Sequence, residues 1–324
     1  MPGGLKSVAR ACLAIAQADR IARARSRDMV MVLMYHGVTP GDARPDRGDR
    51  VPAAELDRQI AFMQRHYEVR RLHDWIAGHA PATGRPGAAI TFDDGLRSVR
   101  TVALPILEAH RCPATVFICP GLIDEGKPPW FERLYTILRT ADPSKLRGRS
   151  PGDLYELLGA ELKKLAPAEQ SDRLDLLDRE YRVTALPRSE DRVLLDWEDV
   201  SILVAGGLVD FGAHTMTHPN LSRLTRAEQE EEIVESRDAI RRRVGECKIF
   251  AWPNGLPDDI TPESIDIIRA AGFAASLTAI AGWADFGRER FLVQRTGLGP
   301  GMSRRHFAQR AAGIGGARSS ITMA

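Results

Sequence analysis

Seven short runs of apolar, β-rich residues recur along this chain of 324 residues, and segments of helical pattern separate them. Because the runs are continuously apolar, they are typical of parallel strands that are buried on both faces. Repeated strand–helix alternation restricts the fold to the α/β class, as a barrel or an open doubly wound sheet. The predicted strands are Met29–Tyr35, Ala88–Phe92, Ala114–Ile118, Val209–Ala213, Ile249–Trp252, Ala274–Leu277 and Phe291–Gln294.

The segments between the strands carry helix signals. Residues Ala53–His66 place apolar side chains at helical spacing, and Leu96–His110 continues that pattern. Thr225–Val244 opens with Thr225 and Glu228, which are spaced as a capping box. We therefore expect helices over these three segments.

One region breaks the alternation and marks the domain organisation. Residues 123–196 contain polar, leucine-patterned helical segments and no convincing strand, which predicts a helical insertion in a domain that spans 29–300. Residues 1–28 are predicted to form a basic helical extension. Residues 301–324 are rich in Gly, Ser, Arg and Ala, a composition typical of a disordered tail.

Charge and composition exclude several classes of protein. A net charge of +2 does not indicate a nucleic-acid binder, and no phosphate-binding glycine loop is present. No apolar run is long enough for a transmembrane helix, and no secretory signal is recognised, so a cytoplasmic location is expected. The basic extension could rest on a membrane surface as a peripheral contact, although packing against the domain is favoured. The four cysteines include no CxxC pair, which argues against a zinc knuckle and a disulfide framework.

Polar side chains capable of catalysis follow the predicted strands at their carboxyl ends. In barrel enzymes this edge carries the active site. We therefore predict that these side chains lie in one site. They are Tyr35 and His36 after the first strand, Asp93 and Asp94 after the second, His214 and His218 after the fourth, Asn254 after the fifth and Arg295 at the end of the seventh.

Two of these groups suggest a metal centre. Asp93 and Asp94 leave a buried strand together, so one carboxylate could bind a metal while the other stays free as a base. His214 and His218 are spaced i, i+4, and on one helical turn they would share a face and hold one cation. The alternatives are that Asp94 caps a helix and that the histidines are ordinary.

Several segments together resemble the polysaccharide deacetylase family, the NodB-homology group or carbohydrate esterase family 4. The resemblance covers residues from about 29 to about 299 and leaves the insertion unmatched. Tyr35-His36 is similar to the beginning of the domain in the branch of the family that includes exopolysaccharide deacetylases. The other matching segments are Thr91–Gly95 (TFDDG), Cys112–Phe117 (CPATVF), Asp196–Trp197 with Ala205–Gly207, His214–His218 (HTMTH) and Phe250–Gly255 (FAWPNG).

The resemblance implies a distorted (β/α)7 barrel of the NodB-homology type that binds one divalent metal, usually zinc. It implies that Asp94, His214 and His218 are the metal ligands and that Asp93 is the general base. Three protein ligands of this kind leave a position for water and substrate. A bound metal would lower the pKa of that water and polarise the acetyl carbonyl. A backbone N–H near Asn254 is a candidate donor to the oxyanion.

Four further residues near the predicted metal site are candidates for roles in the reaction or in substrate binding. His36 is the candidate general acid, with a structural histidine as the alternative. Ala251 and Asn254 stand where the usual third motif has Arg and Tyr, so Arg295 is a candidate to orient the base, with a surface arginine as the alternative. Trp252 could stack on a sugar or belong to the core. Tyr35 is grouped with the substrate-binding residues.

These observations predict a hydrolase that removes N-acetyl groups from amino sugars of a polysaccharide or its lipid-linked precursor. One alternative is a deacylase of a small or nucleotide-linked amino sugar. Another is a non-catalytic carbohydrate-binding relative, which the altered third motif favours. That reading predicts loss of an essential residue, yet all four residues of the predicted metal site and base are present.

Overall fold

The computed structural model of the protein describes residues 18–42, 47–181 and 193–314. Most of the predicted basic extension, with Cys12, and the end of the predicted tail lie outside the described residues. Residues 18–25 are helical, and the side chain of Arg23 lies over the ring of Phe62 at 5.5 Å. This part of the extension therefore contacts the domain.

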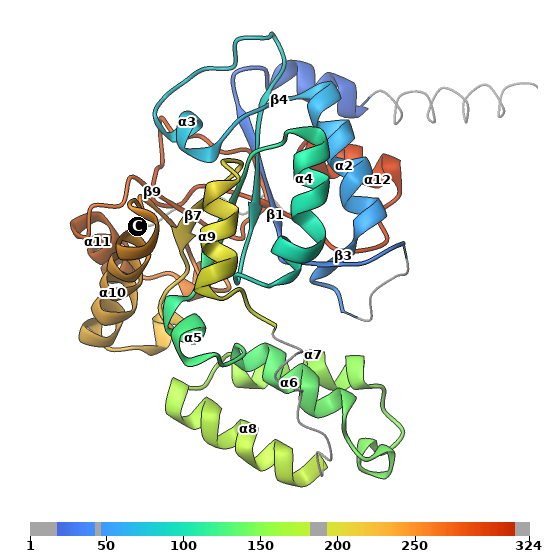
Figure 1. Ribbon diagram of the computed structural model, residues 1–324, viewed down its shortest axis with the longest axis vertical. Coiled ribbons are helices and arrows are strands. Elements are labelled where there is room, and N and C mark those ends of the chain that lie inside the picture. The colour runs from blue at the N-terminus through green and yellow to red at the C-terminus, as the bar shows by residue number, and fades with distance from the viewer. Residues whose placement is uncertain (1–17, 43–46, 182–192, 315–324) are drawn as a thin grey trace, which may run out of the picture.

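Seven parallel strands form a curled sheet at the centre of the molecule (Figure 1). Their order in the sheet is β10-β1-β5-β6-β7-β8-β9, and a short strand, β4 (Glu68–Val69), also pairs with β5. β2 (Gly37–Thr39) and β3 (Arg50–Pro52) form a separate pair. The seven strands are β1 (Val30–Tyr35), β5 (Gly87–Phe92), β6 (Ala114–Ile118), β7 (Val209–Ala213), β8 (Ile249–Ala251), β9 (Ala275–Leu277) and β10 (Thr296–Gly297).

Residues 293–297 join the two edges of this sheet. Val293 bridges Leu277 at the end of β9, and Thr296 pairs with Leu33 of β1. This closure confirms the predicted distorted barrel and excludes the alternative of an open doubly wound sheet. The seventh strand was misplaced at Phe291–Gln294, because part of that apolar run packs against the core instead of pairing.

Helices surround the strands, and their boundaries follow local signals. α2 ends at His66 as predicted, and α10 begins with the predicted capping box between Thr225 and Glu228. A π-helical turn (Val99–Ala103) precedes α4, so the helix predicted over Leu96–His110 is divided. The helices around the barrel are α2 (Ala53–His66), α3 (Leu72–Ile76), α4 (Leu104–His110), α5 (Pro120–Glu125), α9 (Trp197–Ala205), α10 (Arg226–Val244), α11 (Pro262–Ala270) and α12 (Arg304–Ala311).

The prediction of a disordered tail from residue 301 is wrong for α12. Phe307 is buried and meets the ring of Phe62 on α2 edge-on at 5.4 Å. The hydroxyl of Tyr67 donates to the carbonyl of Ala311 at 2.8 Å. The arginine-rich composition concealed the few apolar side chains that attach this helix to the barrel.

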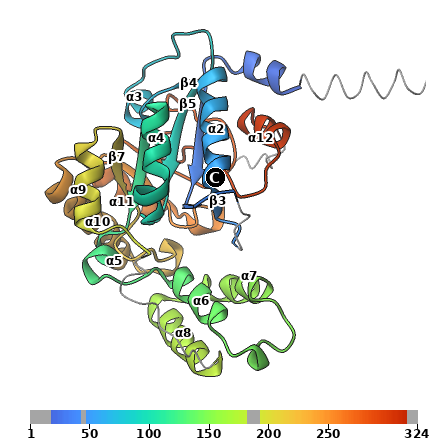
Figure 2. The same ribbon diagram turned by 45° about the vertical axis from the view of Figure 1, so that its right-hand side comes forward.

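The helices of the predicted insertion form a separate layer at one end of the barrel (Figure 2). They are α6 (Trp130–Arg139), α7 (Pro151–Leu162) and α8 (Pro167–Tyr181), with a 3₁₀ turn at Pro143–Leu146. Among the described residues, no helix has the length and apolar character needed to cross a membrane. The insertion has a core of its own, made of Leu134, Ile137, Leu138, Ala141, Leu154, Leu158, Leu162, Leu174, Leu177 and Tyr181.

Candidate functional site

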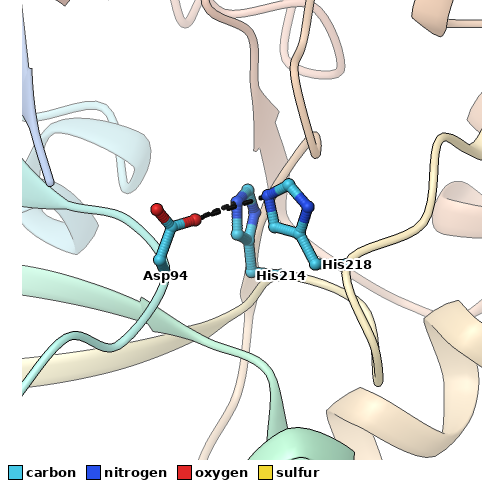
Figure 3. A group of neighbouring side chains, drawn as sticks. All are labelled: Asp94, His214 and His218. Carbon is cyan, nitrogen blue, oxygen red and sulfur yellow. Dashed lines mark ion pairs between the residues drawn. The ribbon is translucent and has the colours of Figure 1, made fainter. Parts of the chain in front are cut away.

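Asp94, His214 and His218 converge at the carboxyl ends of the strands (Figure 3). Oδ1 of Asp94 lies 3.5 Å from Nε2 of His214 and 3.4 Å from Nε2 of His218. Ligands of a tetrahedral zinc ion at about 2.0–2.2 Å stand roughly 3.3–3.6 Å from one another. The three buried side chains therefore have the chemistry and the spacing to hold one divalent metal.

The histidines meet through a tight loop, which corrects the expectation of a helical turn. Thr215 and His218 both adopt the left-handed conformation, with φ of 65° and 62°. Oγ1 of Thr215 accepts a hydrogen bond from the backbone N–H of His218 at 3.0 Å. Left-handed backbone is uncommon for residues with a side chain, and such positions cluster at functional sites. Asp94 shares this property, with φ of 70°.

A carboxylate on α10 holds the loop between the histidines. Glu232 accepts hydrogen bonds from the backbone N–H groups of Met216 at 2.7 Å and Thr217 at 3.0 Å. Burial raises the pKa of Glu232, although these hydrogen bonds act against the shift. Sequence reasoning missed this residue because it stands in an acidic run, which usually marks a solvated face.

His214 has a backbone partner behind it. Its Nδ1 lies 2.7 Å from the carbonyl oxygen of Ala251, so Nδ1–H can donate there and leave Nε2 free to bind a metal. Burial lowers the pKa of His214, but the carboxylates of Asp94 and Asp93 raise it by more. For His218, burial outweighs Asp94, and its pKa is lowered. The lowered pKa favours the neutral imidazole that metal binding requires.

Asp93 is not one of the three converging donors, and its carboxylate forms an ion pair with Arg295 instead. Nη1 and Nη2 of Arg295 donate to the two carboxylate oxygens at 2.7 and 2.8 Å, and Nε donates to the carbonyl of Thr278 at 2.8 Å. Arg295 is fully buried, so it is not a surface residue. Burial raises the pKa of Asp93, but Arg295 and His214 lower it by more, and the net pKa is below the ordinary value.

A cavity of about 330 Å³ opens above these groups. His36 and Asn254 line it as predicted, and Asn254 is also left-handed, with φ of 58°. Trp252 contributes to the wall but is only 1% exposed, and its Nε1–H donates to Oγ of Ser276 at 3.0 Å. It therefore belongs mainly to the core and offers little surface for stacking on a sugar.

Tyr35 does not line the cavity, which corrects its assignment to substrate binding. Its side chain is fully buried, and its hydroxyl donates to Oε1 of Gln59 on α2 at 2.8 Å. Successive side chains of a strand point to opposite faces, so Tyr35 packs toward the helix while His36 reaches the cavity.

The insertion supplies the opposite wall of the cavity, as its position outside the matched motifs suggested, but the sequence did not show which of its residues would do so. α7 turns one helical face toward it, and small side chains in the middle of that face leave room. A second cavity of about 440 Å³ adjoins the first beside His36 and extends the cleft toward Gly297–Gly299. The wall residues from the insertion are Trp130, Phe131, Tyr155, Glu156, Gly159, Ala160 and Lys163.

A sequence model described as polysaccharide deacetylase matches residues 80–276. This range contains Asp93, Asp94, His214 and His218, whereas His36 and Arg295 lie outside it. A search of curated proteins gave no match.

Solved deacetylase structures share the fold at low sequence identity. *Streptococcus pyogenes* deacetylase PplD in complex with acetate superposes with a TM-score of 0.60 at 16% identity, over 87% of this chain and 98% of that one. IcaB from *Ammonifex degensii* gives 0.57 at 20% identity, with coverage of 88% and 96%. The BpsB deacetylase domain from *Bordetella bronchiseptica* gives 0.55 at 16%, with coverage of 85% and 97%.

Proposed function

The chain belongs to the polysaccharide deacetylase family, whose enzymes hydrolyse non-peptide amide bonds, and from this premise we propose its substrate and the roles of its residues. The proposed reaction removes N-acetyl groups from amino sugars of a polysaccharide or of its lipid-linked precursor. The adjoining cavities support a chain of sugars over a single small sugar, because the cleft continues beyond the metal site.

One observation carries the proposal: three metal donors converge beside a separate carboxylate that Arg295 holds. Asp94, His214 and His218 would hold the metal, and the mixed imidazole and carboxylate set suits zinc. When bound, the metal would polarise the acetyl carbonyl and lower the pKa of water in the site.

The protein's own residues would then manage the protons. Asp93 removes a proton from the attacking water, and Arg295 keeps that carboxylate ionised and oriented. His36, on the cavity wall, gives a proton to the sugar nitrogen as the carbon–nitrogen bond breaks. A backbone N–H at Asn254 would donate to the negative charge that develops on the acetyl oxygen. The products are acetate and a sugar with a free amine.

The test is acetate release after metal removal and zinc restoration. The substrates are N-acetylglucosamine oligomers and a lipid-linked N-acetyl sugar. We expect activity only with metal, and which substrate is hydrolysed faster decides between polymer and precursor. Asp93→Asn should retain zinc and lose activity by about 10²–10⁴-fold, the usual contribution of a general base.

His214→Ala should lose zinc binding, whereas His73→Ala, at a half-exposed histidine away from the cavity, should behave as the wild type. Wild-type protein that binds no zinc would refute the metal site. An Asp93→Asn variant with full activity would refute the role of Asp93 alone.

A further inference from the structure

The two histidines of the metal centre are held in different ways. His214 is oriented by the carbonyl of Ala251. Nδ1 of His218 is buried, and across residues 18–42, 47–181 and 193–314 no protein group accepts or donates a hydrogen bond there. Histidines that bind metals are normally oriented through their second ring nitrogen, so His218 requires another support.

An aromatic ring from the insertion provides that support. Phe131, the second residue of α6, meets the imidazole of His218 edge-on, with ring centroids 5.1 Å apart and planes at 69°. Its side chain is buried and also lines the cavity. Aromatic pairs prefer this geometry, and the contact restricts rotation of the imidazole.

The neighbour of Phe131 attaches α6 to the barrel. Glu132 is buried, and its Oε1 pairs with Nη1 of Arg47 at 2.8 Å and with Nη2 of Arg50 at 2.7 Å. Arg50 belongs to β3, which directly precedes α2 of the barrel. Buried ion pairs fix geometry strongly because separation would leave a charge without a partner.

Arg47 also contacts two aromatic rings from the insertion. Its guanidinium lies 4.7 Å from the ring centroid of Tyr135 and 5.1 Å from that of Tyr155, and Nη2 lies 3.2 Å from the hydroxyl of Tyr155. Its charge is further paired with Asp49. A single buried arginine therefore connects the barrel to both α6 and α7.

We infer that the insertion positions the metal ligand His218: Phe131 fixes the imidazole, and the pairing of Arg47 with Glu132 fixes Phe131. Phe131 is thus a positioning residue through which the insertion determines metal affinity, in addition to forming the substrate wall. This inference rests on the proposed function in one respect, namely that Asp94, His214 and His218 bind the metal.

The test measures metal binding directly. Zinc affinity is determined by competition with a chromogenic chelator, and the visible spectrum of the cobalt-loaded protein reports the geometry of the ligands. Phe131→Leu should weaken zinc binding by about tenfold, the lower end of the effect of losing a ligand's support, and should change the cobalt spectrum. Phe62→Leu, at a ring that packs on α12, is the matched control and should change neither.

A second variant leaves Phe131 in place. Arg47→Met combined with Glu132→Gln removes both charges of the pair, and it should weaken zinc binding in the same direction by less than Phe131→Leu. If Phe131→Leu does not fold, Phe131→Met decides the question, because it fills the space without a ring.

Unchanged zinc affinity and an unchanged cobalt spectrum in the Phe131 variant would overturn the inference and leave the proposed function intact. An equal loss in Phe62→Leu would also overturn it, because general destabilisation would then explain the effect. Failure of the wild-type protein to bind zinc would instead refute the proposed function.

Discussion

The barrel and the insertion contribute opposite walls of the same cavity by different physical means. The barrel holds its charged groups through left-handed turns, backbone hydrogen bonds and the buried pair of Asp93 and Arg295. The insertion presents one face of α7 and the ring of Phe131, supported by its own leucine core.

This difference separates two tasks. Groups that carry charge in a reaction need fixed electrostatic partners, because a misplaced buried charge is costly. Groups that shape a cleft need only the right volume and contacts, and single substitutions on a helix face can change both. We therefore expect the barrel wall to provide the reacting groups, and the insertion wall to set access and, through Phe131, the position of His218.

The largest effect on the barrel wall is expected from removing Arg295, the partner of Asp93. Arg295→Met leaves a buried carboxylate without a cation, which should lower the free energy of unfolding by about 3–5 kcal/mol at pH 7. Urea denaturation measures this loss. The exposed pair of Arg226 and Glu263 supplies the control, since Arg226→Met should change stability by less than about 0.5 kcal/mol.

The pH dependence of the same variant has a defined sign. The folded pKa of Asp93 is below its ordinary value, so its stabilising contribution is present above the unfolded pKa of about 3.9 and is lost as the pH falls through the folded pKa. The gap between wild type and Arg295→Met should therefore narrow below about pH 4. A gap that widens on acidification would contradict the assigned pair.

A smaller effect is expected where the barrel wall is held by hydrogen bonds alone. Glu232→Ala releases the backbone N–H groups of Met216 and Thr217, so the loop between the histidines loses its support. We expect zinc binding to weaken by about tenfold in chelator competition. The adjacent Glu231→Ala should leave it unchanged, because Glu231 is exposed. Equal affinities in the two variants would show that the loop is rigid without Glu232.

The smallest effect should come from the insertion wall. A Cβ atom at Gly159 would meet Cδ2 of Leu134 at 3.9 Å, an ordinary contact, so Gly159→Ala should raise the free energy of unfolding by about 0.5–1 kcal/mol. Thermal denaturation measures the gain, with Gly152→Ala near the start of the same helix for comparison. Because Gly159 lines the cavity, KM for acetate release should rise modestly. An unchanged KM would show that the substrate does not reach this part of the insertion wall.

Local patterns in the sequence determined much of this protein. Apolar runs located six of the seven strands closely, and the segments after β5 and β7 pointed to Asp94, His214 and His218, which converge in the structure. The reason is that strand burial, helix capping and short motifs depend on neighbours in the chain, which a sequence displays directly.

Only the tertiary structure decided which distant groups meet. Arg295 pairs with Asp93 across 202 residues, and Phe131 of the insertion contacts His218 of the barrel rim. The sequence offered Arg295 as a candidate with no geometry and gave no indication of the contact made by Phe131. The closure of the barrel at residues 293–297 and the burial of Tyr35 were likewise fixed by packing. Such contacts depend on how layers assemble in three dimensions, and no local spacing encodes them.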